Sequence, residues 1–331
     1  MGPTSHDQDL RSDVDRYPTV VRAAWLYYKD NLTQAEIAER LFVSRATVGR
    51  LLEVARDEGI VRFEISADHL SALELSARVR DTFGLDDAVV VPRIVSGPRP
   101  DRVNSRVAAA AAEYLGRYLR PGAVIGVGWG DTVMRVLFAL SRYALDGVTI
   151  AAVAGGIDVY TREVTARNTN GVNEHLRVIP APLVASSATI AQALRGDTSV
   201  RSVLELAAGA VATLTGIGAA DAGAARPGRA GPYTPGQVAR FRAAGGVGDM
   251  LGEWFDAAGA VVPSETSDRR IGISLDELRA RRNVIGVAGG QEKTAAIVGA
   301  LLGGYLDVLI TDEGTAELLV SHPAVPAAGH H

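Results

Sequence analysis

The stretch IGVGWGDT, residues 125–132, ends an apolar run and places three glycines at alternate positions before an acid and a threonine. The run that begins at Ala123 is typical of a buried strand, and a helical pattern starts at Asp131. A glycine-rich turn between a strand and a helix exposes backbone N–H groups, which bind anions and hydroxylated ligands. The stretch therefore predicts an α/β unit with a ligand site at this turn.

Apolar runs alternate with helical patterns on both sides of the turn. Strands are expected at 86–93, 123–128, 148–153, 178–184, 210–214, 283–288 and 307–311, and helices at 104–119, 131–140, 199–208, 291–303 and 313–320. This alternation is typical of a mostly parallel sheet with helices on its faces. The glycine- and proline-rich segment 223–236 is expected to be an exposed excursion from that sheet.

The spacing of the glycines argues against a dinucleotide enzyme. The dinucleotide fingerprint is G-x-G-x-x-G with an acid about 20 positions further on. Gly126, Gly128 and Gly130 give G-x-G-x-G instead, and Asp146 precedes the next strand rather than following it. What the turn retains is a set of N–H groups at a helix start.

Length and composition limit the remaining classes. A chain of 331 residues suggests two domains, since a usual domain holds roughly 100 to 200 residues. The absence of cysteine excludes disulfides, thiolate metal sites and a cysteine nucleophile. We find no secretory signal and no apolar run of roughly 18 residues, so we expect a soluble, cytoplasmic protein without a membrane partner. Because the net charge is −4, any contact with DNA must be local.

The segment LTQAEIAERLFVSRATVGRLLEVARDEGI, residues 32–60, predicts two helices joined by a very short turn. Thr33 and Glu36 have the spacing of a capping box, and Ser44 caps a second helix directly after Phe42 and Val43. A helix is expected before this segment, from residue 17 to about residue 31, and a short strand after it, at 61–65.

The second helix of this pair has one apolar and one outward face. Its buried face comprises Val48, Leu51, Leu52 and Ala55, and its first turns present Arg45, Ala46, Thr47 and Arg50. Arginine binds guanine in the major groove, and Gln34 of the preceding helix could hold a phosphate. Residues 17–65 contain as many acidic as basic side chains, so the arginines could also be solvated surface charges. The spacing of the caps favours DNA binding through Thr33, Gln34, Ser44, Arg45, Ala46, Thr47 and Arg50.

This segment resembles the helix-turn-helix of the SorC/DeoR-type sugar-binding transcriptional regulators. Further matches follow in the family's order: IGVGWGDT, VIPAPLVAS (178–186), TLTGIG (213–218), GGVGDMLGEWFDAAG (245–259) and the stretch from VIGVAGGQEK to TDEGTAELLV (284–320). The resemblance covers roughly residues 17–320. It implies a helix-turn-helix domain and a larger Rossmann-like α/β effector domain, similar to sugar-phosphate isomerases and deaminases. Gly49 is a departure, because relatives often carry serine there.

The expected organisation has five parts. They are a disordered tail at 1–16, the DNA-binding domain at 17–65, a linker helix at 66–80, the effector and oligomerisation domain at 81–322, and a tail at 323–331. His330 and His331 resemble the remnant of a purification tag and are left out of metal arguments.

Three further loops are expected to join the glycine turn at the strand ends, where open α/β sheets bind ligands. Gly155 and Gly156 follow one strand, Gly248 and Asp249 are expected to open a helix, and residues 289–293 follow another strand. The expected effector site comprises Gly128, Trp129, Gly130, Asp131, Thr132, Gly155, Gly156, Asp249, Gly289, Gly290, Glu292 and Lys293.

The resemblance implies a sugar or polyol at this site, commonly phosphorylated. Lys293 could neutralise a phosphate, and Asp249 could accept hydrogen bonds from hydroxyl groups. Taken singly, the glycines could be plain turns, Asp249 a helix cap and Lys293 a solvated side chain. Asp131 would repel a phosphate dianion, so an unphosphorylated polyol is an alternative.

An enzyme of the isomerase or deaminase class is the alternative function. Asp249, Glu292 and His175 are candidate acid–base groups, but no nucleophile–base pair or metal cluster has diagnostic spacing. We expect no cofactor and no metal. The sequence predicts a regulator of carbohydrate or polyol metabolism that binds operator DNA, a sugar-like effector and copies of itself, as a homodimer or homotetramer.

Overall fold

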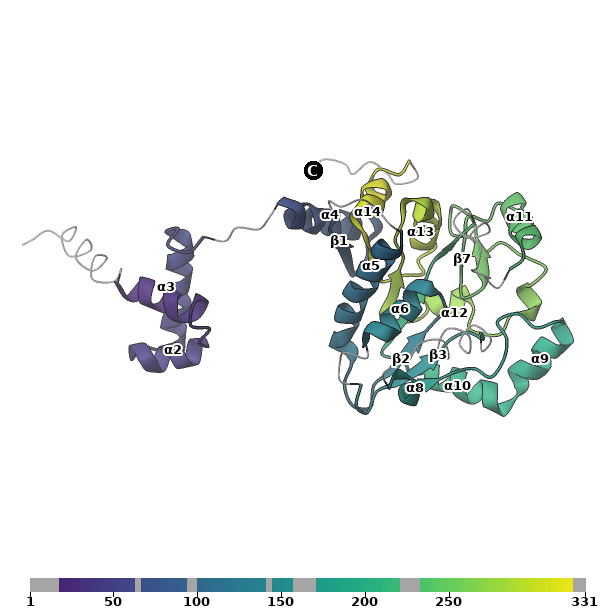
Figure 1. Cartoon of the computed structure of the whole chain (residues 1–331), viewed down its shortest axis with the longest axis horizontal. Helices are drawn as coiled ribbons and strands as arrows, with labels where there is room; N and C mark the ends of the chain where they lie inside the picture. Colours follow the sequence, from purple (N-terminus) through teal and green to yellow (C-terminus); the bar gives the residue numbers. More distant parts are fainter. Residues whose placement is uncertain are drawn as a thin grey trace, which may run out of the picture. The chain divides into compact units, whose positions relative to one another are not determined.

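The computed structural model describes residues 18–62, 67–93, 100–140, 145–156, 171–220 and 233–323. The tail expected at 1–16, residues 63–65 of the expected strand and most of the excursion at 223–236 lie outside these ranges, as do residues 324–331. The chain forms two compact units, Met1–Ser66 and Ala67–His331 (Figure 1).

The smaller unit is helical. A helix over residues 18–28 precedes α2 (Gln34–Leu41) and α3 (Arg45–Asp57). Its core contains Val20, Ala23, Ala24 and Leu26 of the first helix, Ile37 and Ala38 of α2, and Val48, Leu51, Leu52 and Ala55 of α3. The expected buried face of α3 is thus confirmed.

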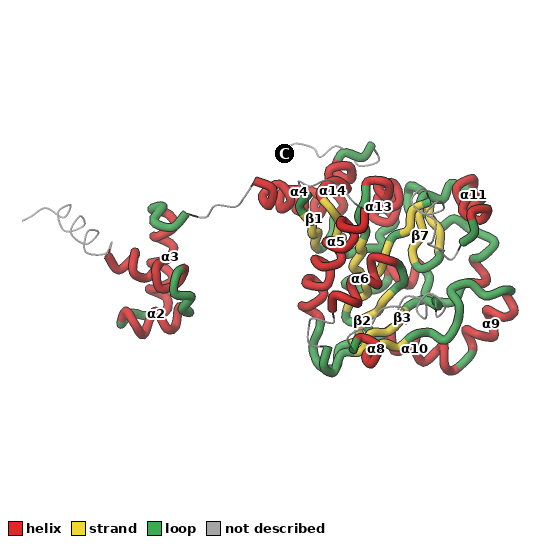
Figure 2. The backbone as a smooth tube through the Cα atoms, in the orientation of Figure 1, coloured by secondary structure: helices red, strands yellow, loops and turns green. Residues whose placement is uncertain are grey.

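The larger unit is built on a seven-stranded sheet in the order β1-β10-β9-β5-β2-β3-β4, with every neighbouring pair parallel. Figure 2 shows strands of this unit among its helices. The strands are β1 (Asp87–Val91), β2 (Val124–Val127), β3 (Thr149–Ala152), β4 (Leu176–Arg177), β5 (Ala212–Gly216), β9 (Val284–Val287) and β10 (Val308–Asp312). Helices bury both faces of these strands, which explains why the strands read as continuous apolar runs.

Two helical layers cover the sheet. On one face, α5 (Pro100–Leu115) packs on α6 (Asp131–Leu140), and both contact the strands (Figure 1). The helices of the other face are α4 (Ala67–Phe83), α10 (Thr198–Ala208), α13 (Thr294–Leu302) and α14 (Glu313–Val320). Neighbouring residues of β9 pack on opposite faces of the sheet. Ile285 belongs to the core beneath α5 and α6, and Val284 belongs to the core beneath α4, α13 and α14. This doubly wound α/β architecture confirms the expected fold class.

A small antiparallel sheet adds to the parallel one. It consists of β6 (Gly218–Ala219), β7 (Gly248–Met250) and β8 (Glu253–Phe255). The remaining described elements are α8 (Val172–His175), α9 (Ala188–Gly196), α11 (Pro235–Ala243), α12 (Leu275–Arg279) and the 3-10 turns η1 (Gly116–Tyr118), η2 (Ser267–Arg269) and η3 (Gln291–Lys293).

Two sequence expectations are wrong. Residues 178–184 do not form a strand, since β4 ends at Arg177. Pro180 and Pro182 have no N–H to donate, so an apolar run containing them cannot continue the sheet. Gly248 and Asp249 open no helix either, because they belong to β7.

No helix in the described ranges is long and apolar enough to cross a membrane.

Candidate functional site

The turn between α2 and α3 is held by the two expected caps. In α2, the backbone N–H of Thr33 donates to Glu36 Oε2 at 2.7 Å and the Glu36 N–H donates back to Thr33 Oγ1 at 3.3 Å. The Thr33 hydroxyl also donates to Glu36 Oε2 at 2.7 Å, and this bond, together with that of the Thr33 N–H, lowers the pKa of the Glu36 carboxyl. In α3, the N–H of Thr47 donates to Ser44 Oγ at 3.0 Å. The capping box and the Ser44 cap are confirmed.

The proposed recognition residues lie on the solvent side of α3. Arg45, Ala46 and Arg50 are exposed, and within residues 18–62 neither arginine forms an ion pair. A Cβ added to Gly49 would meet no described atom within 4 Å, so the packing of the protein does not require glycine there. The exposed face of α3 is thus small and basic, which suits a major groove.

Sequence reasoning missed Phe42 in the same turn. Its side chain is 96% exposed and its φ is 57°, in the left-handed region that usually favours glycine. Its N–H closes α2 by donating to Glu39 O at 3.3 Å. In the sequence, only the short interval of two residues before Ser44 indicated a tight turn at this position.

In the larger unit, the glycine turn lies where predicted, between β2 and α6 at the carboxyl edge of the sheet. Gly130 has a φ of 153°, and within the described residues the N–H groups of Gly130 and Thr132 find no acceptor. Gly128 serves packing, because a Cβ there would lie 2.7 Å from Leu251 Cδ2. The turn therefore combines N–H groups open to a ligand with a backbone covered by Leu251.

Asp131, at the start of α6, is paired with a cation. Arg135 Nε donates to Asp131 Oδ2 at 3.0 Å, and Arg135 Nη1 donates to Ser105 Oγ at 2.9 Å. Both side chains of the pair are only 20–25% exposed. The partner compensates the negative charge that the sequence placed beside the turn.

Gly155 and Gly156 follow β3, but their N–H groups are already used. They donate to Ile271 O at 2.9 Å and to Ala181 O at 3.0 Å. A Cβ on Gly156 would lie 2.6 Å from the Trp129 ring, whose Nε1 donates to Ala154 O at 2.8 Å. These glycines thus provide room for Trp129 and offer no amide to a ligand.

Asp249 projects from β7, which pairs antiparallel with Gly218 of β6. A Cβ on Gly218 would come within 2.0 Å of Asp249 Oδ1, so glycine at this position makes room for the carboxyl group. Burial raises the pKa of Asp249 to about 6, while Lys293 and the N–H of Gly252 oppose the shift. A carboxyl group in this state can accept or donate a hydrogen bond near neutral pH.

Lys293 lies near the Asp249 carboxyl and lowers its pKa. It lies at the end of η3, after β9, and its Nζ donates to Ile217 O at 3.1 Å. The N–H of Gly290 donates to Asp312 Oδ2 at 2.8 Å, and Gly289 leaves space for the same carboxylate. Glu292 is exposed and turns back over Gly290, so no described contact brings it to Lys293 or Asp249.

These contacts converge at one point of the sheet. From β2 the chain goes on to β3 and β4 on one side, and from β5 it goes on to β9 and β10 on the other. The carboxyl ends of β2 and β5 therefore flank the topological switch point, where α/β sheets bind ligands. The glycine turn, Ile217–Gly218, Asp249 and Lys293 meet there.

Comparison with known proteins divides the chain into the same two units. The Sugar-bind family model, which describes a sugar-binding domain, matches residues 68–321, and the MarR family model matches residues 23–69. Transcriptional regulator LsrR of Klebsiella pneumoniae subsp. pneumoniae is 36% identical over 305 residues, 91% of this chain and 92% of that protein. LsrR of Escherichia coli K12 is 35% identical over 91% of this chain and 94% of its own length.

This chain belongs to the SorC/DeoR-type family of sugar-binding transcriptional regulators. Among solved structures, the full-length sorbitol operon regulator SorC of Klebsiella pneumoniae has 27% sequence identity and a TM-score of 0.66, covering 92% of this chain and 98% of that one. The likeness extends over both units of the regulator.

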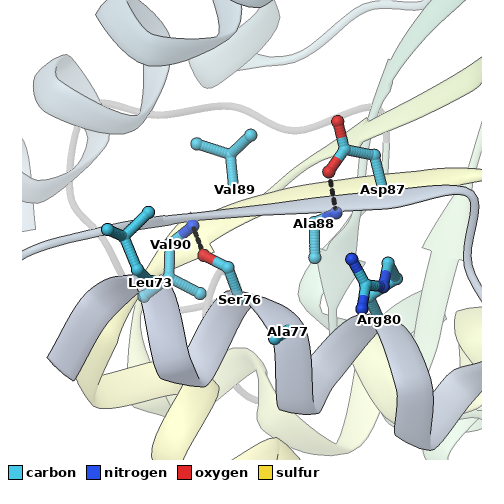
Figure 3. A pocket seen from close by; sticks show the side chains of 8 residues that line it. All are labelled: Leu73, Ser76, Ala77, Arg80, Asp87, Ala88, Val89 and Val90. Atoms are coloured by element: carbon cyan, nitrogen blue, oxygen red, sulfur yellow. Dashed lines mark hydrogen bonds between the residues drawn. The ribbon is translucent and has the colours of Figure 1, made fainter. Parts of the chain in front are cut away.

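In this SorC/DeoR-type regulator, α4 comes directly after the DNA-binding unit in the sequence and packs on the edge strand β1. A groove of about 290 Å³ lies between them. In it, Ser76 Oγ accepts the N–H of Val90 at 3.0 Å and Asp87 accepts that of Ala88 at 2.9 Å. Figure 3 shows the side chains that line the groove. Side chains thus satisfy these two amides of the edge strand.

Sequence reasoning missed a second attachment of α4. The Glu313 carboxylate is only 8% exposed, and it accepts Ser71 Oγ–H at 2.8 Å and the N–H of Arg93 at 2.7 Å. Glu313 follows Asp312, whose carboxylate holds Gly290. Two adjacent acids thus connect the Gly290–Lys293 segment with the linker helix.

The candidate acid–base groups for catalysis are not brought together. His175 Nδ1 lies 3.0 Å from Val148 O, at the amino edge of the sheet, opposite Asp249. In the described residues of the regulator, no group of three His, Cys, Asp or Glu side chains could hold a metal ion.

Proposed function

We propose that this regulator controls genes of carbohydrate or polyol use, and that a sugar, a polyol or a sugar phosphate bound at the switch point of its sheet alters its affinity for operator DNA. The observation that carries the proposal is the convergence of the glycine turn, Asp249 and Lys293 in a domain that matches the sugar-binding family. The helix-turn-helix would supply the binding to operator DNA.

On the DNA side, the exposed start of α3 would enter the major groove. Arg50 and Arg45 would reach base edges or phosphates, and the methyl-bearing Ala46 and Thr47 would meet thymine methyl groups. The caps Thr33 and Ser44, together with Gln34, lie at the helix starts, where N–H groups and side chains commonly hold DNA phosphates.

On the effector side, each polar group has a distinct task. The open N–H groups at the start of α6 and the Lys293 ammonium would hold the negative end of a ligand, and Asp249 would bind hydroxyl groups. Gly155 and Gly156 would act only through the position of Trp129. Glu292, at the exposed rim, is the weakest member of the proposed set.

The Asp131–Arg135 pair supports a phosphorylated ligand. An unpaired carboxylate at the start of α6 would repel a phosphate, but the Arg135 guanidinium offsets its charge at 3.0 Å. A phosphate at the N-terminus of α6 therefore meets less repulsion than the sequence indicated. An unphosphorylated polyol, bound mainly by Asp249, is the second candidate.

We infer no catalytic role for the α/β domain. The relatives are transcriptional regulators, and the acid–base candidates are separated between the two edges of the sheet. Turnover of a sugar phosphate by the purified protein would overturn this inference.

The regulatory step requires more than one chain and two conformations. Two recognition helices that read one operator require at least a homodimer, and the family resemblance favours a homotetramer. A ligand can shift the equilibrium only if it binds the two conformations with different affinity. The contacts Gly290–Asp312 and Glu313–Ser71 support a route from the effector segment to α4, and thus to the chain leading into the DNA-binding unit.

A thermal-shift panel tests the effector assignment. It contains ribose, glucose, fructose, sorbitol and xylitol, each free and as its terminal phosphate. A ligand at 100 times its dissociation constant stabilises the protein by about 2.7 kcal/mol, which is readily measured. We expect at least one compound to stabilise the wild type and to lose this effect in Asp249→Asn. Equal stabilisation of both proteins would remove Asp249 from the site.

A further inference from the structure

The turn between β7 and β8 has an unusual conformation. Met250 pairs with Glu253, so the hairpin loop contains only Leu251 and Gly252, with φ values of 53° and 80°. Two consecutive left-handed residues define a type I′ turn, whose first position usually carries asparagine, aspartate or glycine. A leucine there is strained, because its Cβ crowds the following carbonyl oxygen. Other contacts must hold the turn in place.

Every residue of this turn is tethered to a distant segment. Arg270 Nη1 donates to Leu251 O at 3.3 Å and to Ile273 O at 2.6 Å. Tyr233 Oη–H donates to Gly252 O at 2.7 Å. Glu253 pairs with Arg270 Nη2 at 3.3 Å and accepts the N–H of Leu275 at 2.5 Å.

The Leu251-Gly252 turn lies against two parts of the proposed effector site. The side chain of Leu251 covers Gly128 of the glycine turn. Asp249 lies on β7 only two residues before Leu251, and the nearby N–H of Gly252 lowers the pKa of its carboxyl, so the position of that carboxyl depends on the turn. A rotation of the Leu251-Gly252 peptide would displace both at once.

Burial of the Arg270 guanidinium costs desolvation free energy. The residue is 6% exposed, its Nε has no partner in the described residues, and desolvation lowers its pKa. A buried ion pair is often no more stabilising than apolar side chains of the same volume. The buried guanidinium of Arg270 is therefore better explained by its hydrogen bonds to the turn than by a gain in the stability of the fold.

We propose that Arg270 is a positioning residue of the effector site: its guanidinium, with Glu253 and Tyr233, holds the Leu251-Gly252 turn so that Asp249 faces the effector. This inference rests on the proposed function of Asp249. Arg270 acts through the turn and does not touch the ligand.

The test compares Arg270→Met with a matched control. Arg281→Met removes another half-buried guanidinium that binds a carbonyl, Ala207 O at 2.6 Å, but does not contact the turn. The first readout is the pKa of Asp249 without ligand, obtained from the pH dependence of the stability difference between each full-length protein and its Asp249→Asn counterpart. Among the described residues, Lys293 and Tyr233 are the charged or titratable groups that interact with this carboxyl, and Arg270→Met leaves both in place. Glu253 loses its ion pair with Arg270, but it does so equally in both members of the Arg270→Met pair.

Release of the turn should admit water to Asp249. Displacement of the Gly252 N–H alone would raise the pKa of Asp249, but burial is the largest cause of its shift, so the pKa should fall from about 6 toward its ordinary value in Arg270→Met and stay at about 6 in Arg281→Met. Tyr233→Phe removes a single hydroxyl and should produce a smaller fall, which keeps the test valid if Arg270→Met does not fold. An unchanged or higher pKa in both turn variants would overturn the proposal.

The second readout is ligand binding. Each compound of the thermal-shift panel that binds the wild type should bind Arg270→Met roughly tenfold more weakly, the effect of about one misplaced charge-assisted hydrogen bond. Arg281→Met should bind normally, and equal weakening by both variants would contradict positioning. If the wild type binds no compound of the panel, the effector assignment fails, while the pKa of Asp249 still decides the role of Arg270.

Discussion

The DNA-binding unit and the effector domain present their proposed contact residues in different ways. In the first, these residues lie between Thr33 and Arg50 and depend on two local caps. In the second, the glycine turn, Asp249 and Lys293 come from distant segments, and parallel strand pairing with two side-chain tethers brings them together. A local site withstands changes elsewhere in the fold, whereas an assembled site responds to them, which suits a sensor.

Arg50→Ala should produce the largest effect, and only in the DNA-binding unit. Loss of a bidentate base contact costs about 1–3 kcal/mol per half-site, so a dimer should lose operator affinity by at least roughly tenfold. Fluorescence anisotropy at fixed salt measures this loss. Arg56→Ala removes the same charge from the last turn of α3 and should cost much less. Equal losses would show that α3 contributes only general charge.

A pH series should reveal the titration of Asp249 in the effector domain. Between about pH 4 and pH 6 the folded protein retains a proton on Asp249 that the unfolded chain has lost, so the contribution of Asp249 to stability falls as pH rises through this window. Relative to Asp249→Asn, we expect a fall of about 2–3 kcal/mol in the free energy of unfolding. Paired urea melts at pH 4 and pH 7 measure it. Parallel pH profiles for the two proteins would refute the buried state of Asp249.

Glu313→Gln should separate binding from coupling. The amide keeps the shape of the side chain but holds Ser71 and Arg93 less firmly, so effector binding should persist while the change in operator affinity shrinks by about 0.5–2 kcal/mol. Calorimetry with the best compound of the panel, followed by operator titration with that compound, separates the two quantities. Glu317→Gln, on the same helix, breaks only an exposed ion pair and serves as the control. An unaltered response in Glu313→Gln would exclude this route.

Gly49→Ala should give the smallest effect. Alanine stabilises a helix interior by up to about 1 kcal/mol, and no described atom obstructs its Cβ. Thermal melting should show a slightly more stable DNA-binding unit. Unchanged operator affinity would mean that glycine has no role in recognition, and reduced affinity would indicate close approach of the DNA backbone at this position.

The same contrast explains why the DNA-binding unit could be predicted from the sequence and much of the effector site could not. Capping and helical periodicity act over a few residues, so the sequence predicted α2, α3 and the glycine turn before α6. The position of Asp249 depended on an antiparallel hairpin with leucine in a left-handed turn, for which no local pattern exists. The pairing of Glu313 with Ser71 could not be inferred, because long-range packing decides it, whereas the i,i+4 spacing of Asp131 and Arg135 is a local signal that sequence reasoning missed.

We expect ligand binding at Asp249 to change the affinity of α3 for operator DNA. The most direct measurement is the operator affinity of the full-length protein at fixed salt, with and without the panel compound that stabilises it most. We predict a change of roughly 5- to 150-fold in the wild type, and an Asp249→Asn variant that binds the operator but no longer responds. A wild-type affinity that the compound leaves unchanged, or a full response in Asp249→Asn, would contradict the account.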